Sequence, residues 1–388
     1  MKSLLIAISL FLLVPFFNHA CSMYKVTKDG KTIVGNNEDW ISPNSQFWFE
    51  KGQKGEYDAM YMGLLNRFPQ GGFNSAGLMF DGFANDYLEI GNTEGKRSIP
   101  MPEAIQHVMK TMSKVAEVEA YFSTIDLSIL ERGQIVFVDE SGDYLIVEGE
   151  EMISGSEAEQ CFSNFYYSQI ESMEEVELDN VKNGLDFIRN NEAQATLDYT
   201  SRVMQSMQSV GELTQYTTVY DLQNLKVRVY LFHDFSQFEE FSLDEYIKKG
   251  NHSVMIADLF PKDASGRANY EAFNNPKNPV EFYEKMVGDE KLSEEELEAQ
   301  GFSWIFNTIG YEWLLYKNSP QVAIQVFEYA TELMPNNANL FDSLGEAYMA
   351  NNEPIKSKKA YEKSIELNPE NEGAKAALKA INEYLNGG

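Results

Sequence analysis

A cysteine stands where a short apolar leader ends, and this placement is the first sign of chemistry in the sequence. Behind Lys2, residues 4–17 form an apolar run that is too short to cross a membrane but is typical of a cleaved export signal. The small residue Ala20 places the cut between Ala20 and Cys21. We therefore expect residues 1–20 to be a signal peptide and the mature chain to begin at Cys21.

A cysteine at a new N-terminus combines a nucleophile and a base in one residue. Its α-amine has a pKa near neutrality, so the amine can take the thiol proton directly or through one water. Before cleavage the same nitrogen is an amide, so export processing would activate the residue. Cys21 is therefore the candidate nucleophile, and Asp39 is the carboxylate expected beside the amine, where it would stabilise the protonated form.

Two other fates of Cys21 stay open at this point. The chain has one further cysteine, Cys161, and two cysteines in an exported protein can form a disulfide. A cysteine directly after an export signal is also where bacterial lipoproteins carry their lipid. Either modification would remove the free thiol, so these fates exclude the nucleophile.

The elements around Cys21 are expected to form a hairpin that brings the chain back to it. Residues 22–28 alternate polar and apolar side chains, Asp29-Gly30 is a two-residue turn signal, and residues 32–35 are predicted to be the returning strand. Asp39 would then lie close to the cysteine. Further strands are expected over residues 134–139, 144–148, 214–222 and 226–232, and helices after Pro102 and over 179–189 and 197–207.

Composition and missing motifs exclude several classes of function. The formal net charge is −29, which repels phosphate backbones and anionic headgroups, so neither nucleic-acid nor membrane-surface binding is expected. The sequence has no HExxH, no paired CxxC and no glycine-rich phosphate loop, and no metal or cofactor is expected. No segment after residue 20 is long and apolar enough to span a bilayer, so the mature chain is expected in the periplasm or outside the cell.

Five short motifs, in order along the chain, resemble one enzyme family. Cys21 through GNNEDW (35–40), NSAGLMFDGFA (74–84), QCFSNF (160–165), YTSR (199–202) and LTQYTTVYDL (213–222) resemble landmarks of the choloylglycine hydrolase family. These N-terminal nucleophile (Ntn) hydrolases include bile salt hydrolases and penicillin V acylases. The resemblance implies an α/β fold, an αββα sandwich of antiparallel sheets over residues 21–262. It also implies hydrolysis of a linear amide C–N bond in a small N-acyl substrate, without a cofactor.

The resemblance also assigns site residues. Cys21 is the nucleophile and Asp39 the carboxylate beside its amine. Asn164 matches an asparagine whose side-chain amide helps to form the oxyanion hole, and Arg202 matches an arginine near the nucleophile that favours the thiolate.

Two positions depart from the pattern of bile salt hydrolases. Asn36 stands where those enzymes have an arginine, and Ala84 stands where they have a second oxyanion asparagine. The next residue, Asn85, is expected on the opposite face of a strand. The loss of the arginine argues against assuming a bile salt or any other particular anionic substrate.

The C-terminal part of the chain differs from the rest in composition and contains a sequence repeat. Residues 263–299 begin with a stretch rich in proline, glycine and asparagine and are expected to be a linker. Beyond it ELMPNN and ELNPEN recur with Pro335 and Pro369 34 residues apart, which is the tetratricopeptide period. Residues 300–388 are thus expected to be all-α repeats that bind a protein partner, self-associate or pack as an appendage. A noncatalytic scaffold, or an acyltransferase with the same nucleophile, is the alternative to a hydrolase.

Overall fold

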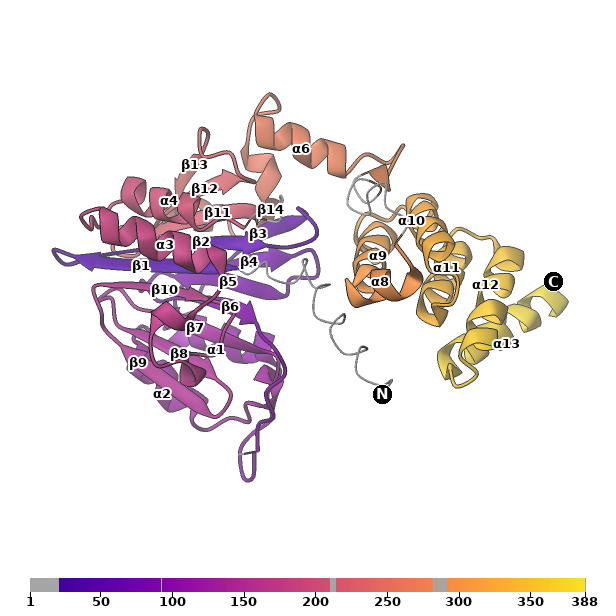
Figure 1. Cartoon of the computed structure of the whole chain (residues 1–388), viewed down its shortest axis with the longest axis horizontal. Helices are drawn as coiled ribbons and strands as arrows, with labels where there is room; N and C mark the ends of the chain where they lie inside the picture. The colour runs from indigo at the N-terminus through magenta and orange to yellow at the C-terminus, as the bar shows by residue number, and fades with distance from the viewer. Residues whose placement is uncertain (1–20, 92, 210–213, 282–283, 285–291, 388) are drawn as a thin grey trace, which may run out of the picture. The chain divides into compact units, whose positions relative to one another are not determined.

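The computed structural model describes residues 21–91, 93–209, 214–281, 284 and 292–387. The chain divides after Asn269 into two units, and the second begins at Tyr270 (Figure 1). This division falls inside the segment 263–299 that the sequence analysis assigns to a linker. Among the described residues of that segment are the helices α6 (Ser265–Phe273) and α8 (Glu294–Ala299).

The first sheet is antiparallel and carries the N-terminal hairpin. Its turn is at Asp29 and Gly30, both with positive φ, as the turn signal predicts. The returning strand is longer than expected and includes Asp39. In the order β10-β1-β2-β11-β12-β13, the strands are β10 (Glu159–Ser163), β1 (Ser22–Lys28), β2 (Lys31–Asp39), β11 (Thr214–Asp221), β12 (Lys226–Leu231) and β13 (Glu239–Ser242).

The second sheet is also antiparallel and has eight strands in the order β14-β3-β4-β5-β6-β7-β8-β9. Its central strands follow one another along the chain, so the sheet is built mainly from consecutive hairpins. The strands are β3 (Ser45–Glu50), β4 (Ala59–Leu64), β5 (Pro69–Asn74), β6 (Met79–Ala84), β7 (Gly133–Val138), β8 (Tyr144–Glu148), β9 (Glu151–Gly155) and β14 (His252–Met255).

Helices cover the outer face of each sheet, which gives the αββα layers that the family resemblance implies (Figure 1). Helices α3 (Asp179–Asn190) and α4 (Leu197–Ser206) pack on the first sheet, and α1 (Met101–Thr111) and α2 (Val115–Phe122) on the second. The predicted helices over 179–189 and 197–207 are therefore present. Shorter helices are α5 (Leu243–Ile247) and single turns at 128–130, 167–169, 173–175 and 256–259.

Alternation along the strands decides which side chains enter the space between the sheets. Tyr24 and Val26 of β1 lie on the outer face, in one apolar cluster with Val203 of α4. On the inner face, the hydroxyl of Tyr220 donates to the sulfur of Met62 in the second sheet at 3.0 Å. The residues of β2 that pair with the inward-facing positions of β11, and the residues of β1 that pair with those of β2, therefore face the second sheet.

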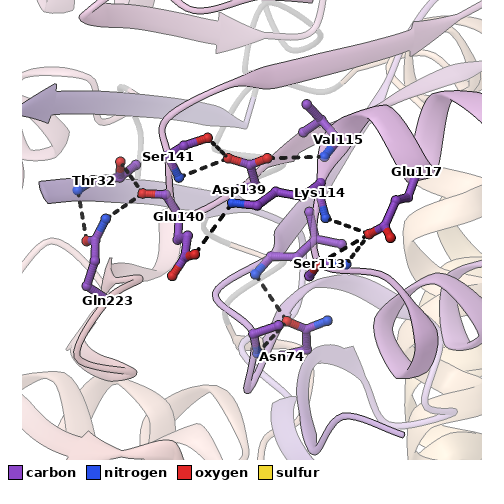
Figure 2. A network of polar contacts seen from close by, with 12 residues as sticks. Thr32, Asn74, Ser113, Lys114, Val115, Glu117, Asp139, Glu140, Ser141 and Gln223 are labelled. Carbon is purple, nitrogen blue, oxygen red and sulfur yellow. Dashed lines mark hydrogen bonds and ion pairs between the residues drawn. The ribbon is translucent and has the colours of Figure 1, made fainter. Parts of the chain in front are cut away.

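A polar network joins the two sheets at the end of β2 that lies far from Asp39 (Figure 2). Thr32, next to the first residue of β2, donates through its hydroxyl to the carbonyl of Glu140 at 3.0 Å. The side chain of Gln223 forms hydrogen bonds with both Thr32 and Glu140. Its oxygen accepts from the Thr32 backbone N–H at 2.9 Å, and its amide donates to the Glu140 carbonyl. The β7–β8 turn, which contains Glu140, is thereby attached to the first sheet.

The second unit is helical in its described residues. Helix α9 (Phe302–Tyr311) continues into a π-helical turn over Glu312–Tyr316, followed by α10 (Pro320–Leu333), α11 (Ala338–Ala350), α12 (Pro354–Leu367) and α13 (Glu372–Gly387). A Cβ added at Gly310 would lie 2.3 Å from the ring of Phe327, and one at Gly345 would lie 3.0 Å from the ring of Tyr361. Both glycines therefore permit close helix pairs, as expected for the repeats, whose assignment remains a prediction. No described helix of the chain is long and apolar enough to cross a bilayer.

Candidate active site

Cys21 lies directly before β1, between two neighbouring strands. Strand β1 starts at Ser22, which pairs with β2 on one side and with β10 on the other. Continuing both antiparallel registers by one position places Cys21 between Glu38 and Asn164. Side chains at directly opposed positions share a face of the sheet, so all three belong to the face that looks toward the second sheet.

The main chain holds the thiol of Cys21. The backbone N–H of Asp39 donates to Sγ at 3.4 Å, and the hydroxyl of Ser163 donates to the Cys21 carbonyl oxygen at 2.7 Å. Cys21 is partly exposed, whereas Ser22, the next residue in the chain, and Ser163 are fully buried. The sulfur is therefore held by its neighbours, in a residue that is itself only partly exposed.

The backbone N–H of Asp39 contacts the thiol, while the Asp39 carboxyl lies among hydroxyl groups. Its carboxylate accepts a hydrogen bond from the Thr214 hydroxyl at 2.6 Å and another from the Ser209 hydroxyl. Burial raises the pKa of Asp39 to about 7, and the two hydroxyls only partly offset this increase. The carboxyl of Asp39 consequently titrates close to neutrality.

Glu38 is the carboxyl on the thiol's own face, and the sequence analysis did not single it out. It is only 2% exposed, and the side-chain amide of Gln70 donates to Oε1. Burial, followed by the negative charge of Asp39, raises the pKa of Glu38 to about 8. Hydrogen bonds with Asn36, Cys21 and Gln70 act in the opposite direction but are weaker.

A second buried carboxyl comes from the opposite sheet. Asp81 of β6 is 1% exposed, and burial and then the charge of Glu38 raise its pKa well above the ordinary range. Tyr216 of β11 pairs with Glu38, and its pKa is raised by burial and then by the charges of Glu38 and other neighbours that include Asp81 and Cys21. Glu38, Asp81, Tyr216 and Cys21 thus surround one region between the sheets.

Asn164 reaches from the first sheet to the second. Its side-chain amide donates to the carbonyl oxygen of Ala84 at 2.5 Å. Strand β6 ends at Ala84, so Asn85 lies outside the strand. The expectation that its side chain points to the opposite face of a strand therefore does not apply. Both side-chain polar atoms of Asn85 are buried and have no hydrogen-bond partner among the described residues. Two side-chain amides therefore lie beside the backbone of Ala84 and Asn85.

The expectation for Arg202 is not supported by its position. Arg202 is exposed on α4, and its guanidinium carbon lies 5.2 Å from the ring centroid of Phe187 in α3. Helix α4 turns Tyr199 and Val203 toward the outer face of the first sheet, which leaves Arg202 on the polar side of the helix. The thiol belongs to the inner face of the first sheet, whereas Arg202 stacks on Phe187 in the helix layer over the outer face.

Cys161 is a buried apolar residue of the first sheet. It pairs with Tyr24 and is buried in the apolar cluster under α3 and α4, where burial raises its pKa to about 12. Both cysteines are free, so the structure has no disulfide between Cys21 and Cys161. In the described part of the chain, no group of three or more His, Cys, Asp or Glu side chains is arranged to hold a metal ion.

Comparisons with known proteins find similarity among solved structures. No family model and no curated protein matches the sequence. The penicillin V acylase from Agrobacterium tumefaciens is similar with a TM-score of 0.43 and 13% identity, over 54% of this chain and 82% of that chain. A mutant of the conjugated bile acid hydrolase from Clostridium perfringens is similar with a TM-score of 0.46 and 16% identity, over 61% of this chain and 96% of that chain. These are also the kinds of protein that the sequence motifs resemble.

Proposed function

We propose that the protein is a cysteine hydrolase of the N-terminal nucleophile type that cleaves the linear amide C–N bond of a small N-acyl substrate. The observation that carries this proposal is the position of the Cys21 thiol, which has a main-chain donor at Sγ and lies between Asn164 and a buried carboxyl. Cleavage before Cys21 in an export pathway would add the α-amine that such a nucleophile needs.

In this mechanism the α-amine of Cys21 takes the thiol proton, and the sulfur attacks the carbonyl carbon of the substrate amide. The tetrahedral intermediate collapses with cleavage of the C–N bond, and the ammonium of Cys21 protonates the departing amine. Water then attacks the thioester, releases the acyl group as a carboxylic acid and restores the thiol. Asp39 stabilises the protonated amine. An acyltransferase would use a second amine in place of water.

The oxyanion of the intermediate needs hydrogen-bond donors that are in place before the reaction starts. Asn164 Nδ2 carries two hydrogens, and its bond to the Ala84 carbonyl uses one of them. Asn85, whose side-chain amide is buried and unpartnered among the described residues, is the second candidate. We assign both amides to the oxyanion hole in this proposal.

The proposal includes export to the periplasm or the cell exterior and a role for the C-terminal helices. A cleft of about 580 Å³ lies at α12 and α13, lined by Ile365, Lys375, Leu378, Lys379, Asn382, Glu383 and Asn386. Its apolar and basic side chains would suit a protein partner or a second copy of this acidic chain. A noncatalytic exported or lipid-anchored scaffold, in which these helices carry the function, is the alternative.

The first test is the intact mass and N-terminal sequence of the exported protein, followed by turnover of a panel of N-acyl amides. We expect an unmodified N-terminal Cys21, amide turnover in the wild type, and no turnover in Cys21→Ser with an unchanged circular dichroism spectrum. Cys161→Ser is the matched control and should retain turnover if it folds, because Cys161 is buried on the opposite face. A lipidated Cys21, or full turnover in Cys21→Ser, would overturn the proposal in favour of the scaffold.

A further inference from the structure

The carboxyl that faces the nucleophile is Glu38, and it belongs to no part of the mechanism above. Cys21 and Glu38 occupy opposed positions at the open end of the β1–β2 ladder. Opposed residues of an antiparallel pair have Cβ atoms about 4.5–5.5 Å apart, which brings a glutamate carboxyl within reach of a cysteine sulfur. Asp39, one residue further, belongs to the other face and is occupied by the hydroxyls of Ser209 and Thr214.

In the uncleaved chain, no side-chain cation among the described residues balances the two buried carboxyls on this face. The titratable groups around Glu38 are the thiol of Cys21 directly before β1 and, after cleavage, its α-amine, Asp39 from its own strand, Asp81 from β6, and Tyr216 and Tyr220 from β11. Within the described residues, neither Glu38 nor Asp81 forms an ion pair with a lysine, arginine or histidine. The hydroxyl of Tyr216 and Oδ2 of Asp81 are buried there without a hydrogen-bond partner.

Two neighbouring carboxyls that are both buried cannot both be ionised, because desolvation and mutual repulsion oppose the second charge. The pair keeps at least one proton at neutral pH. The Gln70 amide donates to Oε1 of Glu38, so the remaining oxygen is the one that can carry this proton.

We propose that Glu38 is a further catalytic residue, a neutral carboxylic acid that donates a hydrogen bond to the sulfur of Cys21. The proposal rests on the proposed function, because it assigns a role at the same nucleophile. When the α-amine takes the thiol proton, the sulfur becomes an anion and accepts the Glu38 O–H bond alongside the Asp39 N–H. Glu38 keeps its proton throughout, and the bond is made again when the thioester releases the sulfur.

The ionised form of Glu38 would have the opposite effect. A carboxylate opposite Cys21 can no longer donate, and its negative charge repels the thiolate. The charge of Glu38 is in fact the largest cause after burial of the raised pKa of the Cys21 thiol. The nucleophile should therefore lose reactivity as Glu38 loses its proton, at a pH that burial and the charge of Asp39 set.

The test is the rate of alkylation of Cys21 by iodoacetamide as a function of pH, in protein whose N-terminal Cys21 has been verified by mass. The alkylated peptide is quantified by mass spectrometry, and the buried Cys161 in the same molecule is an internal reference. In the wild type we expect the rate to rise with pH and then to bend below a single-ionisation curve where Glu38 ionises, at a pH that the α-ammonium of Cys21 lowers from about 8.

Three variants separate the roles of the two carboxyls. Glu38→Gln should follow a single-ionisation curve without the bend. Asp81→Asn should keep the bend near the wild-type pH, because burial and the charge of Asp39 are what raise the pKa of Glu38. Glu38→Leu, which has no donor, should react roughly tenfold more slowly than the wild type near neutral pH, as expected for loss of a hydrogen bond to a charged group. Glu192→Gln, in an exposed side chain, is the matched control and should keep the wild-type curve.

An identical bend in the wild type and Glu38→Gln, with both proteins folded by circular dichroism, would overturn the role of Glu38. Alkylation needs no substrate, so this result is independent of the proposed amide hydrolysis. Absence of turnover with every acyl amide, together with the expected alkylation curves, would instead remove the proposed function and keep the contact between Glu38 and the thiol.

Discussion

The carboxylate of Asp39 accepts a hydrogen bond from the hydroxyl of Thr214 at 2.6 Å, and the two residues are paired across the β2–β11 ladder. The register of the first sheet thus fixes where this carboxyl points. Together with Ser209 it occupies a small hydroxyl pocket on the face opposite the thiol. The pKa of Asp39 is nevertheless raised to about 7, because burial outweighs both hydroxyls.

The raised pKa of Asp39 predicts a stability that falls with increasing pH. Folded protein holds this proton up to about pH 7, whereas the unfolded chain releases it near the ordinary aspartate value. The free energy of unfolding should therefore decrease between about pH 4 and 7, by up to a few kcal/mol, since one pKa unit corresponds to about 1.4 kcal/mol. In Asp39→Asn the decrease should be smaller, although Glu38 and Asp81 contribute in the same direction.

Urea denaturation of the full chain at several pH values, followed by tryptophan fluorescence, measures this dependence. The exposed Asp263→Asn is the control and should keep the wild-type slope. The same measurement on a chain that begins at Cys21 adds an α-ammonium near the carboxyl, which should lower the pKa of Asp39 and flatten the curve. A parallel pH dependence in wild type and Asp39→Asn would contradict a raised pKa at this position.

The two side-chain amides near Ala84 predict a loss of rate rather than of binding. Asn164→Ala and Asn85→Ala should each lower kcat for an acyl amide by roughly 10²-fold or more while KM changes little, because an oxyanion donor acts mainly in the transition state. Steady-state kinetics with the N-acyl substrate found in the panel give both parameters. A change confined to KM would assign the amide to substrate binding instead.

Asn37 predicts a stability effect at the junction of the first sheet with α4. It is fully buried, its amide donates to the Met204 carbonyl at 2.9 Å and to the Ser22 hydroxyl at 3.2 Å, and its oxygen accepts from Thr217. Asn37→Ala leaves these groups unsatisfied and should lower the free energy of unfolding by about 2–4 kcal/mol. Chemical denaturation tests this value, with the exposed Asn190→Ala as a control that should cost under about 1 kcal/mol.

Gly310 predicts the packing of the helical unit. A Cβ at this position would lie 2.3 Å from Phe327 Cζ, so Gly310→Ala forces α9 and α10 apart and should cost about 1–3 kcal/mol. Replacing the ring by a smaller side chain, in Gly310→Ala/Phe327→Leu, should recover stability relative to the sum of the single changes. Thermal unfolding followed by the helical circular dichroism signal measures both, and strictly additive losses would argue against the contact.

Local signals predict much of the first sheet. The Asp29-Gly30 turn fixes the hairpin register, and the period of two then decides which side chains share a face. The same register already places Glu38 opposite Cys21, so this residue was open to prediction from the sequence. It was missed because the family motif draws attention to Asp39.

Helix periodicity explains why the expectation for Arg202 fails. Tyr199 and Val203 form the apolar stripe of α4, and a residue one position before Val203 lies about 100° around the helix from it. A match to a short motif assigns a role to a residue without testing which side of the helix its side chain occupies. The position of Asp81 could not be predicted from the sequence, because no local pattern indicates that β6 of the second sheet carries the carboxyl beside Glu38.

The donor that Asp39 offers to the Cys21 sulfur is its backbone N–H. Replacement of the side chain at position 39 leaves this contact in place for every amino acid except proline, which lacks the hydrogen. The carboxylate and the amide of one residue are therefore separable under mutation. Substitutions at position 39 can therefore change the charge and the pKa values of the site while the backbone N–H keeps its contact with the sulfur.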